Sequence, residues 1–152
     1  MSTTIDDVDD LHSLLGRQLE SSGWFDITQD RVNTFAGATD DHQWIHVDVE
    51  RAIADSPYGG PIAHGYLTLS MLSAMFLQVL TVRQASMAVN YGLNKVRFPA
   101  PVPVGSKVRL TATVASVEDI DGGVQIVLNA AVDCTAASKP VCVAEPVFRF
   151  YR

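Results

Sequence analysis

No Asp, Glu, Lys or Arg occurs between Asp55 and Arg83, and this uncharged segment restricts the possible folds more than any other feature of the chain. A helix that spans a membrane needs about 20 mostly apolar residues. Here Pro57 and Pro61 interrupt the start of the segment, and polar side chains interrupt the rest: His64, Thr68, Ser70, Ser73 and Gln78. A helix that is apolar on nearly all sides belongs in a core. We therefore expect a buried central helix over residues 66–80 and no membrane span.

The segments on either side of this helix have different patterns. Residues 4–15 predict a short amphipathic helix, residues 24–27 a short strand, and Thr28 can cap a helix that runs to Gly37. From residue 86 onward, apolar residues alternate with polar ones and turn residues recur, which predicts a meander of long antiparallel strands. Pro146 in the last of them suggests a bulge or an edge position. We expect an α+β fold in one domain over residues 1–152, with a sheet wrapped around the helix.

Charge is divided unevenly along the chain. The net charge is −6, with 3 basic and 12 acidic side chains in residues 1–55 and 8 basic and 5 acidic ones in residues 56–152. A broad basic face for nucleic acid is therefore not expected. The split could supply carboxylates for chemistry and cations for an anionic ligand, or it could serve solubility alone.

Two features bear on the cellular compartment. The first sixteen residues carry four Asp, where a targeting peptide would carry positive charge. Cys134 and Cys142 have a spacing that fits neither a zinc site nor a thioredoxin-like motif, and two unpaired cysteines suit a reducing compartment. We expect a cytoplasmic protein without a membrane partner.

The densest cluster of titratable side chains lies in residues 39–46, directly after a predicted helix. The chain lacks the glycine-rich nucleotide loops and the GxSxG motif of serine hydrolases. Asp41 and His46 are the most informative pair, because a carboxylate and an imidazole at one cleft can hold a water molecule and move its protons. The alternative is an Asp that caps a turn and a His that is hydrogen-bonded in the core.

A metal site is the competing interpretation of this segment. His42 and His46 are four residues apart and would share one face of a helix, but Gln43 stands where zinc proteases have Glu, and no third ligand is evident. We expect neither a metal nor another cofactor.

Gly65 would lie in the first turn of the long helix, where free N–H groups point outward at the positive end of the helix dipole. A glycine there lets a carbonyl oxygen approach these donors, although it could equally serve helix packing. Further along, residues 90–99 combine two amides with Lys95 and Arg97, which could line a pocket or contact phosphates, or belong to a solvated edge strand.

At these residues the chain resembles the MaoC-like (R)-specific enoyl-CoA hydratases, in particular the branch of nodulation protein N-like proteins, over about residues 10–150. The family signature reads Asp, any residue, Asn, Pro, an aliphatic residue, His. This chain has Asp41 and His46 at the two ends, with Gln43 and Trp44 in place of Asn and Pro, and it shares the His64-Gly65 pair before the helix.

The resemblance implies a hot-dog fold and a homodimer with each site near the subunit interface. It implies that Asp41 and His46 activate water for syn addition to a trans-2-enoyl-CoA, giving an (R)-3-hydroxyacyl-CoA as in fatty acid metabolism. The Gly65 N–H would polarise the thioester carbonyl. Other residues take supporting roles: Gln43, Trp44, Tyr66 and Asn94 in the substrate pocket, and Lys95 and Arg97 as candidates for the CoA phosphates.

Two alternative functions remain for a chain with this fold. Many hot-dog acyl-CoA thioesterases carry Asp or Glu on the central helix, and residues 66–80 have neither. A non-catalytic acyl-CoA-binding subunit would not need both Asp41 and His46. The expected activity is therefore that of an enoyl-CoA hydratase, a hydro-lyase.

Overall fold

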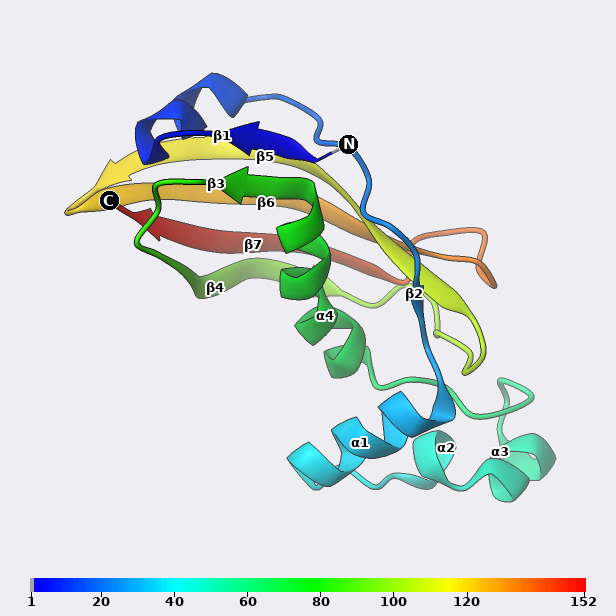
Figure 1. Ribbon diagram of the computed structural model, residues 1–152. Coiled ribbons are helices and arrows are strands. Elements are labelled where there is room, and N and C mark those ends of the chain that lie inside the picture. Colours follow the sequence, from blue (N-terminus) through cyan, green and yellow to red (C-terminus); the bar gives the residue numbers. More distant parts are fainter. Residues whose placement is uncertain (1) are drawn as a thin grey trace.

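A five-stranded antiparallel sheet forms the larger part of the molecule in the computed structural model, which describes residues 2–152 (Figure 1). Its strands lie in the order β2-β5-β6-β7-β4. Their bounds are β2 Phe25–Asp26, β5 Lys107–Ile120, β6 Gly123–Cys134, β7 Cys142–Tyr151 and β4 Met87–Arg97. The expected long antiparallel strands are confirmed, and β5, β6 and β7 follow one another as a meander, but β4 pairs with β7 instead of with β5. The sheet curls around helix α4 (Gly65–Val79), so the expected α+β arrangement is confirmed as well.

The core lies between α4 and the inner face of the sheet. Alternate residues of β6 from Val124 to Val132 are buried, as period-two side chains on one sheet face should be. Phe76 of α4 stacks on Phe148 of β7, with ring centroids 4.5 Å apart. This contact places Phe148 on the helix side of the sheet.

Helix α4 is covered on one side only, which differs from the buried helix that the sequence predicts. Its buried side includes Met75 and Phe76, whereas Tyr66 is 69% exposed and Leu77 is 70% exposed. The uncharged segment therefore encodes one face for the core and a second apolar face that this chain alone leaves open. Within residues 2–152 no helix has both the length and the hydropathy needed to cross a bilayer.

Pro146 marks an irregular point in the sheet, as expected, but it does not lie at an edge. Strand β7 is hydrogen-bonded to β6 on one side and to β4 on the other. Opposite Pro146, the register with β4 shifts between Leu93 and Val96. The missing N–H of proline is thus accommodated at a bulge inside the sheet.

The N-terminal segment is not the single amphipathic helix that residues 4–15 predict. Strand β1 (Thr3–Ile5) pairs in parallel with β3 (Leu80–Val82), and a 3₁₀ helix, η1, follows at Val8–Leu14. Asp7 caps η1 and ends the strand, because its side chain accepts a hydrogen bond from the Asp9 N–H. The capping box at Asp7 therefore divides the segment into two elements.

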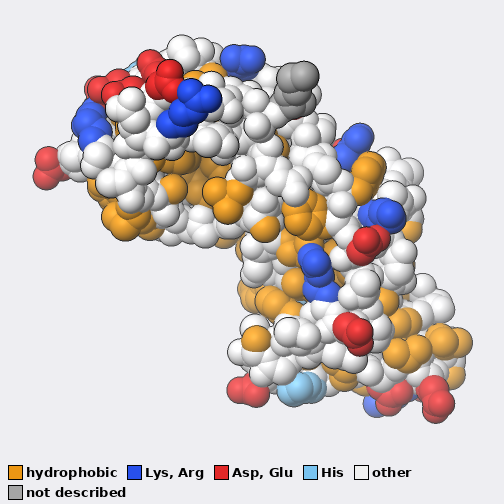
Figure 2. Space-filling view, in the orientation of Figure 1, with side chains coloured by type: hydrophobic (Ala, Val, Ile, Leu, Met, Phe, Trp, Pro, Cys, Tyr) orange, Lys and Arg blue, Asp and Glu red, His pale blue; other side chains and the backbone are white. Residues whose placement is uncertain are grey.

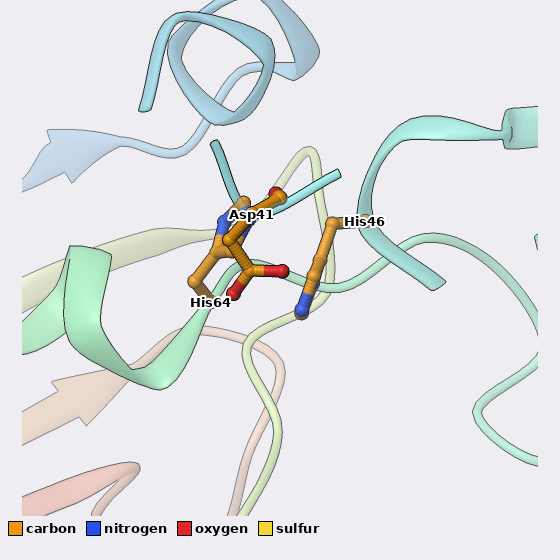
Figure 3. Close-up of side chains that lie close together, drawn as sticks. All are labelled: Asp41, His46 and His64. Carbon is orange, nitrogen blue, oxygen red and sulfur yellow. The ribbon is translucent and has the colours of Figure 1, made fainter. Parts of the chain in front are cut away.

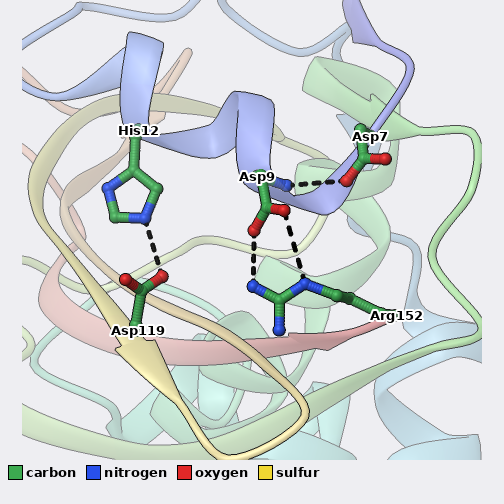
Figure 4. A network of polar contacts seen from close by, with 5 residues as sticks. All are labelled: Asp7, Asp9, His12, Asp119 and Arg152. Atoms are coloured by element: carbon green, nitrogen blue, oxygen red, sulfur yellow. Dashed lines mark hydrogen bonds and ion pairs between the residues drawn. The ribbon is translucent and has the colours of Figure 1, made fainter.

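Part of the acidic charge of this segment is paired with cations from the basic half of the chain. Asp9 forms an ion pair with Arg152 (Figure 4). In the opposite sense, the imidazole of His12 on η1 lies 2.9 Å from the Asp119 carboxylate of β5. The hydrogen bond from Arg152 lowers the pKa of Asp9. These contacts thus hold η1 to the end of the sheet where β5 and β7 terminate, in addition to any effect on solubility.

Three helices form a separate group beyond the other end of the sheet (Figure 1). They are α1 (Gln29–Thr39), α2 (Trp44–Val47) and α3 (Val49–Asp55). Thr28 caps α1 as predicted, accepting a hydrogen bond from the Arg31 N–H at 3.1 Å. Asp40 ends α1 with a φ of 58°, a left-handed conformation that turns the chain sharply before Asp41.

Candidate active site

Asp41, His46 and His64 come together where the α1–α3 group meets the first turn of α4 (Figure 3). One side-chain oxygen or nitrogen from each lies within 4.8 Å of the others. Asp41 is exposed, whereas His46 and His64 are only 7% and 3% exposed. The predicted Asp41–His46 pair is thus in place, with a second imidazole added to it.

The hydrogen bonds of His46 determine which of its nitrogens is available. Its Nδ1 lies 2.6 Å from the main-chain carbonyl of Ile62. A carbonyl oxygen can only accept a hydrogen bond, so Nδ1 carries the proton and Nε2 has a free lone pair in the neutral ring. Gln29, the first residue of α1, donates to the main-chain carbonyl of His46 at 2.8 Å and holds this segment from the other side.

Burial favours the neutral form of His46. Desolvation lowers the pKa of His46, and the nearby His64 lowers it further, whereas the bond to Ile62 and the charge of Asp41 act in the opposite direction. The net effect is a lowered pKa. At neutral pH the ring is therefore a base, as a proton acceptor must be.

The spacing of Asp41 and His46 suits one water molecule. A water whose two O–H groups point to separate acceptors about 2.8 Å away spans about 4.6 Å between them. A carboxylate oxygen of Asp41 and a ring nitrogen of His46 lie within 4.8 Å of each other, and the carboxylate and the free Nε2 of the neutral ring are both acceptors. The site can therefore orient a water molecule with its oxygen lone pairs directed away from both residues.

The same three residues could be considered as a metal site, because a carboxylate and two imidazoles are common ligands of divalent metals. However, the rings of His46 and His64 are stacked, with centroids 3.8 Å apart and planes inclined by 24°. The lone pair of an imidazole nitrogen lies in the ring plane, so two stacked rings direct their lone pairs within two nearly parallel planes rather than towards one point between them. This geometry favours proton transfer over the convergence of both rings on one ion.

Gly65 begins α4 beside this cluster, as the sequence predicts, and lines one cavity with His46 and Thr68. The cavity has a volume of about 420 Å³. The first N–H groups of an α-helix have no partner within the helix, so the start of α4 offers donors to this space. A side chain at position 65 would approach the ring of Phe98 to 3.0 Å, which explains why a residue without Cβ suits this position.

Gln43 and Trp44 lie between Asp41 and His46 in the sequence but do not line this cavity. The Gln43 N–H donates to the Asp41 carboxylate at 3.4 Å, so the main chain of residue 43 contributes more directly than its exposed side chain. Trp44 begins α2 and is half-buried, and the guanidinium of Arg51 lies 4.3 Å from its ring centroid.

Tyr66 lines a second and larger hollow, of about 640 Å³, between α1, α4 and β4. Phe98 borders both this hollow and the cavity at Gly65, and its ring meets that of Tyr66 edge-on at 6.2 Å. Asn94 is exposed on β4 at the register shift and lines neither space.

Lys95 and Arg97 are not brought to the cluster of Asp41, His46 and His64 within the chain. Both line a hollow of about 380 Å³ together with Glu145 and polar residues of β5 and β6. Arg97 pairs with Val143, whose neighbours Cys142 and Ala144 point into the core, so this hollow lies on the outer face of the sheet. Any contact with the ligand of a catalytic site would therefore have to be made across a subunit boundary.

His42 is exposed and precedes α2, so it does not share a helix face with His46 as the spacing suggests. His64 supplies the imidazole that stacks on His46, and the side chain of Gln29 holds the main chain of His46. Sequence reasoning gave neither residue a role of its own. Both come from segments distant from position 46, and no local pattern indicates such contacts.

Comparison with known proteins identifies relatives over most of the chain. A model of the MaoC like domain matches residues 10–135. A 3-hydroxyacyl-thioester dehydratase Z of Mycobacterium tuberculosis is 51% identical over 148 residues, which cover 97% of each chain. Nodulation protein N of Rhizobium leguminosarum bv. viciae is 52% identical over 101 residues, which are 66% of this chain and 63% of that protein.

Solved structures agree on the architecture. The unliganded R-hydratase PhaJ1 of Pseudomonas aeruginosa superposes with a TM-score of 0.73 at 22% identity, covering 91% of this chain and 82% of that one. An (R)-hydratase from A. caviae involved in PHA biosynthesis gives a TM-score of 0.71 at 20% identity, with 88% and 94% covered. At these identities the likeness concerns the fold, and it confirms the expected hot-dog arrangement.

Proposed function

Because the chain belongs to the MaoC-like dehydratase family, we propose that it is an (R)-specific enoyl-CoA hydratase of fatty acid metabolism in the cytoplasm. It adds water syn across the double bond of a trans-2-enoyl-CoA to give an (R)-3-hydroxyacyl-CoA, and it catalyses the reverse dehydration. The observation that carries the proposal is the closeness of the Asp41 carboxylate and the His46 imidazole, whose polar atoms lie within 4.8 Å of each other beside the helix start at Gly65.

The proposed reaction follows from these positions. The water gives one proton to the Asp41–His46 pair while its oxygen bonds to C3 of the substrate. The electrons of the double bond move towards the thioester carbonyl, whose developing negative charge is stabilised by the Gly65 N–H at the positive end of α4. A proton from the Asp41–His46 pair then reaches C2, so the elements of one water molecule are added in total.

Hydrolysis of the thioester is the alternative on this fold. Helix α4 carries no Asp or Glu over residues 65–79, so it lacks the carboxylate that many hot-dog thioesterases place there. Absorbance of the enoyl thioester and release of free thiol, followed in parallel, distinguish the activities. We expect loss of absorbance without thiol. Thiol release would indicate a thioesterase, and neither signal would indicate a binding subunit.

The lowered pKa of His46 predicts the pH dependence of the reaction. The base form of His46 is the neutral one, and a lower pKa keeps it neutral to a lower pH. The acidic limb of kcat/KM should therefore have its midpoint below the ordinary histidine pKa of about 6.5. A midpoint above that value, measured with a saturable short-chain substrate, would mean that His46 is not the group that must be neutral.

We further propose that residues 1–152 act as one domain and associate as a homodimer through β4 and the open side of α4. Figure 2 shows hydrophobic side chains along the hollow between the sheet and the α1–α3 group. On β4, Met87 and Leu93 are 52% and 44% exposed, and within the described part of the chain no strand pairs with the outer edge of β4. An apolar face beside an unpaired edge favours a partner of the same kind.

Leu77→Glu tests this interface. Leu77 is 70% exposed on the open side of α4, and a carboxylate there would be buried against apolar surface in the dimer. We expect sedimentation velocity to show a shift from dimer to monomer. Leu15→Glu is the matched control, because Leu15 is 59% exposed at the end of η1, away from α4. An undisturbed dimer in the Leu77 variant would contradict this choice of surface.

Lys95 and Arg97 are proposed to bind the CoA phosphates of the partner's substrate, since both are exposed on the edge strand that the dimer would use. Reversing both charges should raise KM for enoyl-CoA and weaken its dependence on salt, while kcat changes little. Lys139→Glu, on the exposed loop between β6 and β7, is the control. An unchanged KM in the double variant would exclude these residues as phosphate ligands.

A further inference from the structure

We propose that His64 is a positioning residue of the hydration site, whose Nε2–H fixes Asp41 by its main chain. This inference rests on the proposed function. His64 caps the N-terminus of α4 with no side-chain bond to the helix, so its ring is not used for capping. Instead its Nε2 lies 2.9 Å from the main-chain carbonyl of Asp41, a residue 23 positions earlier.

The proton of His64 can be assigned in the same way as that of His46. The carbonyl of Asp41 only accepts, so Nε2 of His64 is the protonated nitrogen in the neutral ring. Its Nδ1 is buried and has no hydrogen-bond partner among residues 2–152. The single N–H of the neutral ring is therefore the one directed at Asp41.

The ring of His64 is held on two sides. It stacks on His46 at 3.8 Å and meets Phe35 of α1 at 4.9 Å with planes inclined by 57°. These contacts restrict the direction of the Nε2–H bond. The fixed direction of this bond matters because Asp41 is exposed and follows the left-handed residue Asp40. Few packing contacts can fix the loop at this point. The hydrogen bond thus links the loop that carries Asp41 to His64, the residue directly before the helix that begins at Gly65.

Two substitutions separate the donor of His64 from its ring. His64→Gln keeps an N–H donor at a similar reach and removes the ring, whereas His64→Phe keeps a ring in the stack and removes the donor. We expect His64→Phe to lower kcat for hydration at least about tenfold with KM almost unchanged, because a small displacement of a catalytic group is costly. His64→Gln should restore most of kcat. His12→Phe, which changes an exposed histidine on η1, should have no effect.

A second measurement does not depend on activity. Order parameters from ¹⁵N relaxation at the main-chain amides of residues 41–43 should fall towards the flexible range in His64→Phe and stay near wild type in His64→Gln. Equal values in His64→Phe and wild type, or equal losses in both variants, would overturn the proposal. If the wild type hydrates no enoyl-CoA, the proposed function fails, and the order parameters still decide the role of His64.

The wild-type protein provides a test that needs no variant. Long-range ¹H–¹⁵N spectra of the histidine rings should show His64 with its proton on Nε2 and His46 with its proton on Nδ1. The opposite form of His64 would remove the donor to Asp41 and contradict the proposal, even if His64→Phe failed to fold.

Discussion

Asp41→Asn is expected to lower kcat for hydration by about 10²- to 10⁴-fold, the usual contribution of a positioned acid–base group. The amide keeps the size of the side chain and an oxygen that can accept the Gln43 N–H. It loses the negative charge, and its NH₂ group cannot accept a proton from water. Because Asp41 is exposed, the substitution should leave the fold and the dimer intact.

His46→Gln should have a similar effect on kcat for a different reason. Glutamine can fill part of the space of the imidazole, but it has no nitrogen lone pair that could take a proton near neutral pH. Thermal unfolding and sedimentation of each variant control for folding and assembly. A rate within a few-fold of wild type in either variant would show that the pair is not catalytic.

Gly123→Ala is expected to destabilise the protein by about 3 kcal/mol, at the upper end of the cost of overpacking. A Cβ at Gly123 would lie 2.1 Å from the main-chain oxygen of Phe150, and it cannot avoid this oxygen by changing a rotamer. Gly123 begins β6 and pairs with Tyr151 of β7. Because β6 and β7 are neighbours inside the five-stranded sheet, these two strands would have to separate at this pair.

For a chain of this length, such a loss corresponds to a fall in Tm of roughly 6–12 °C. Scanning calorimetry at a fixed protein concentration measures it. Gly60→Ala is the matched control, because a Cβ at Gly60 meets nothing within 4 Å. Equal Tm values for the two variants would contradict the close approach of β6 and β7 at this point.

The central part of the fold could be predicted from the sequence because its patterns are local. Residues 108–132 show the two-residue period of strands, and the uncharged segment after Asp55 shows the 3.6-residue period of a helix. Each element shows its period without reference to the rest of the chain. The open face of α4 could not be predicted in this way. A helix that faces a core on one side and an apolar hollow on the other has the same composition as one that is buried throughout.

The N-terminal segment shows a second limit. Residues 3–5 pair with β3, a strand more than seventy residues later, and the capping box of Asp7 then begins η1. Ile5 and Val8 match a helical pattern, but a tertiary pairing overrides it. Local propensity is a weak guide where a distant strand edge competes for the same residues.

The same distinction between local patterns and tertiary contacts applies to the site. The Asp41–His46 pair could be predicted because its two members lie in one segment and match a family signature in type and spacing. The stack of His64 on His46 and the bond from Gln29 depend on how α1, α2 and α4 meet. Lys95 and Arg97 carry the charge that phosphates require, but the strand turns them to the outer face of the sheet.

Mass spectrometry of the product formed in H₂¹⁸O tests the central claim most directly. The wild-type protein is incubated with a trans-2-enoyl-CoA, and the CoA thioester and the free acid are analysed separately. If Asp41 and His46 direct one water molecule to C3, the label will be found in the 3-hydroxyl group of an intact (R)-3-hydroxyacyl-CoA. Label in the carboxylate of a free acid, or an unlabelled and unchanged substrate, would contradict the proposed hydration.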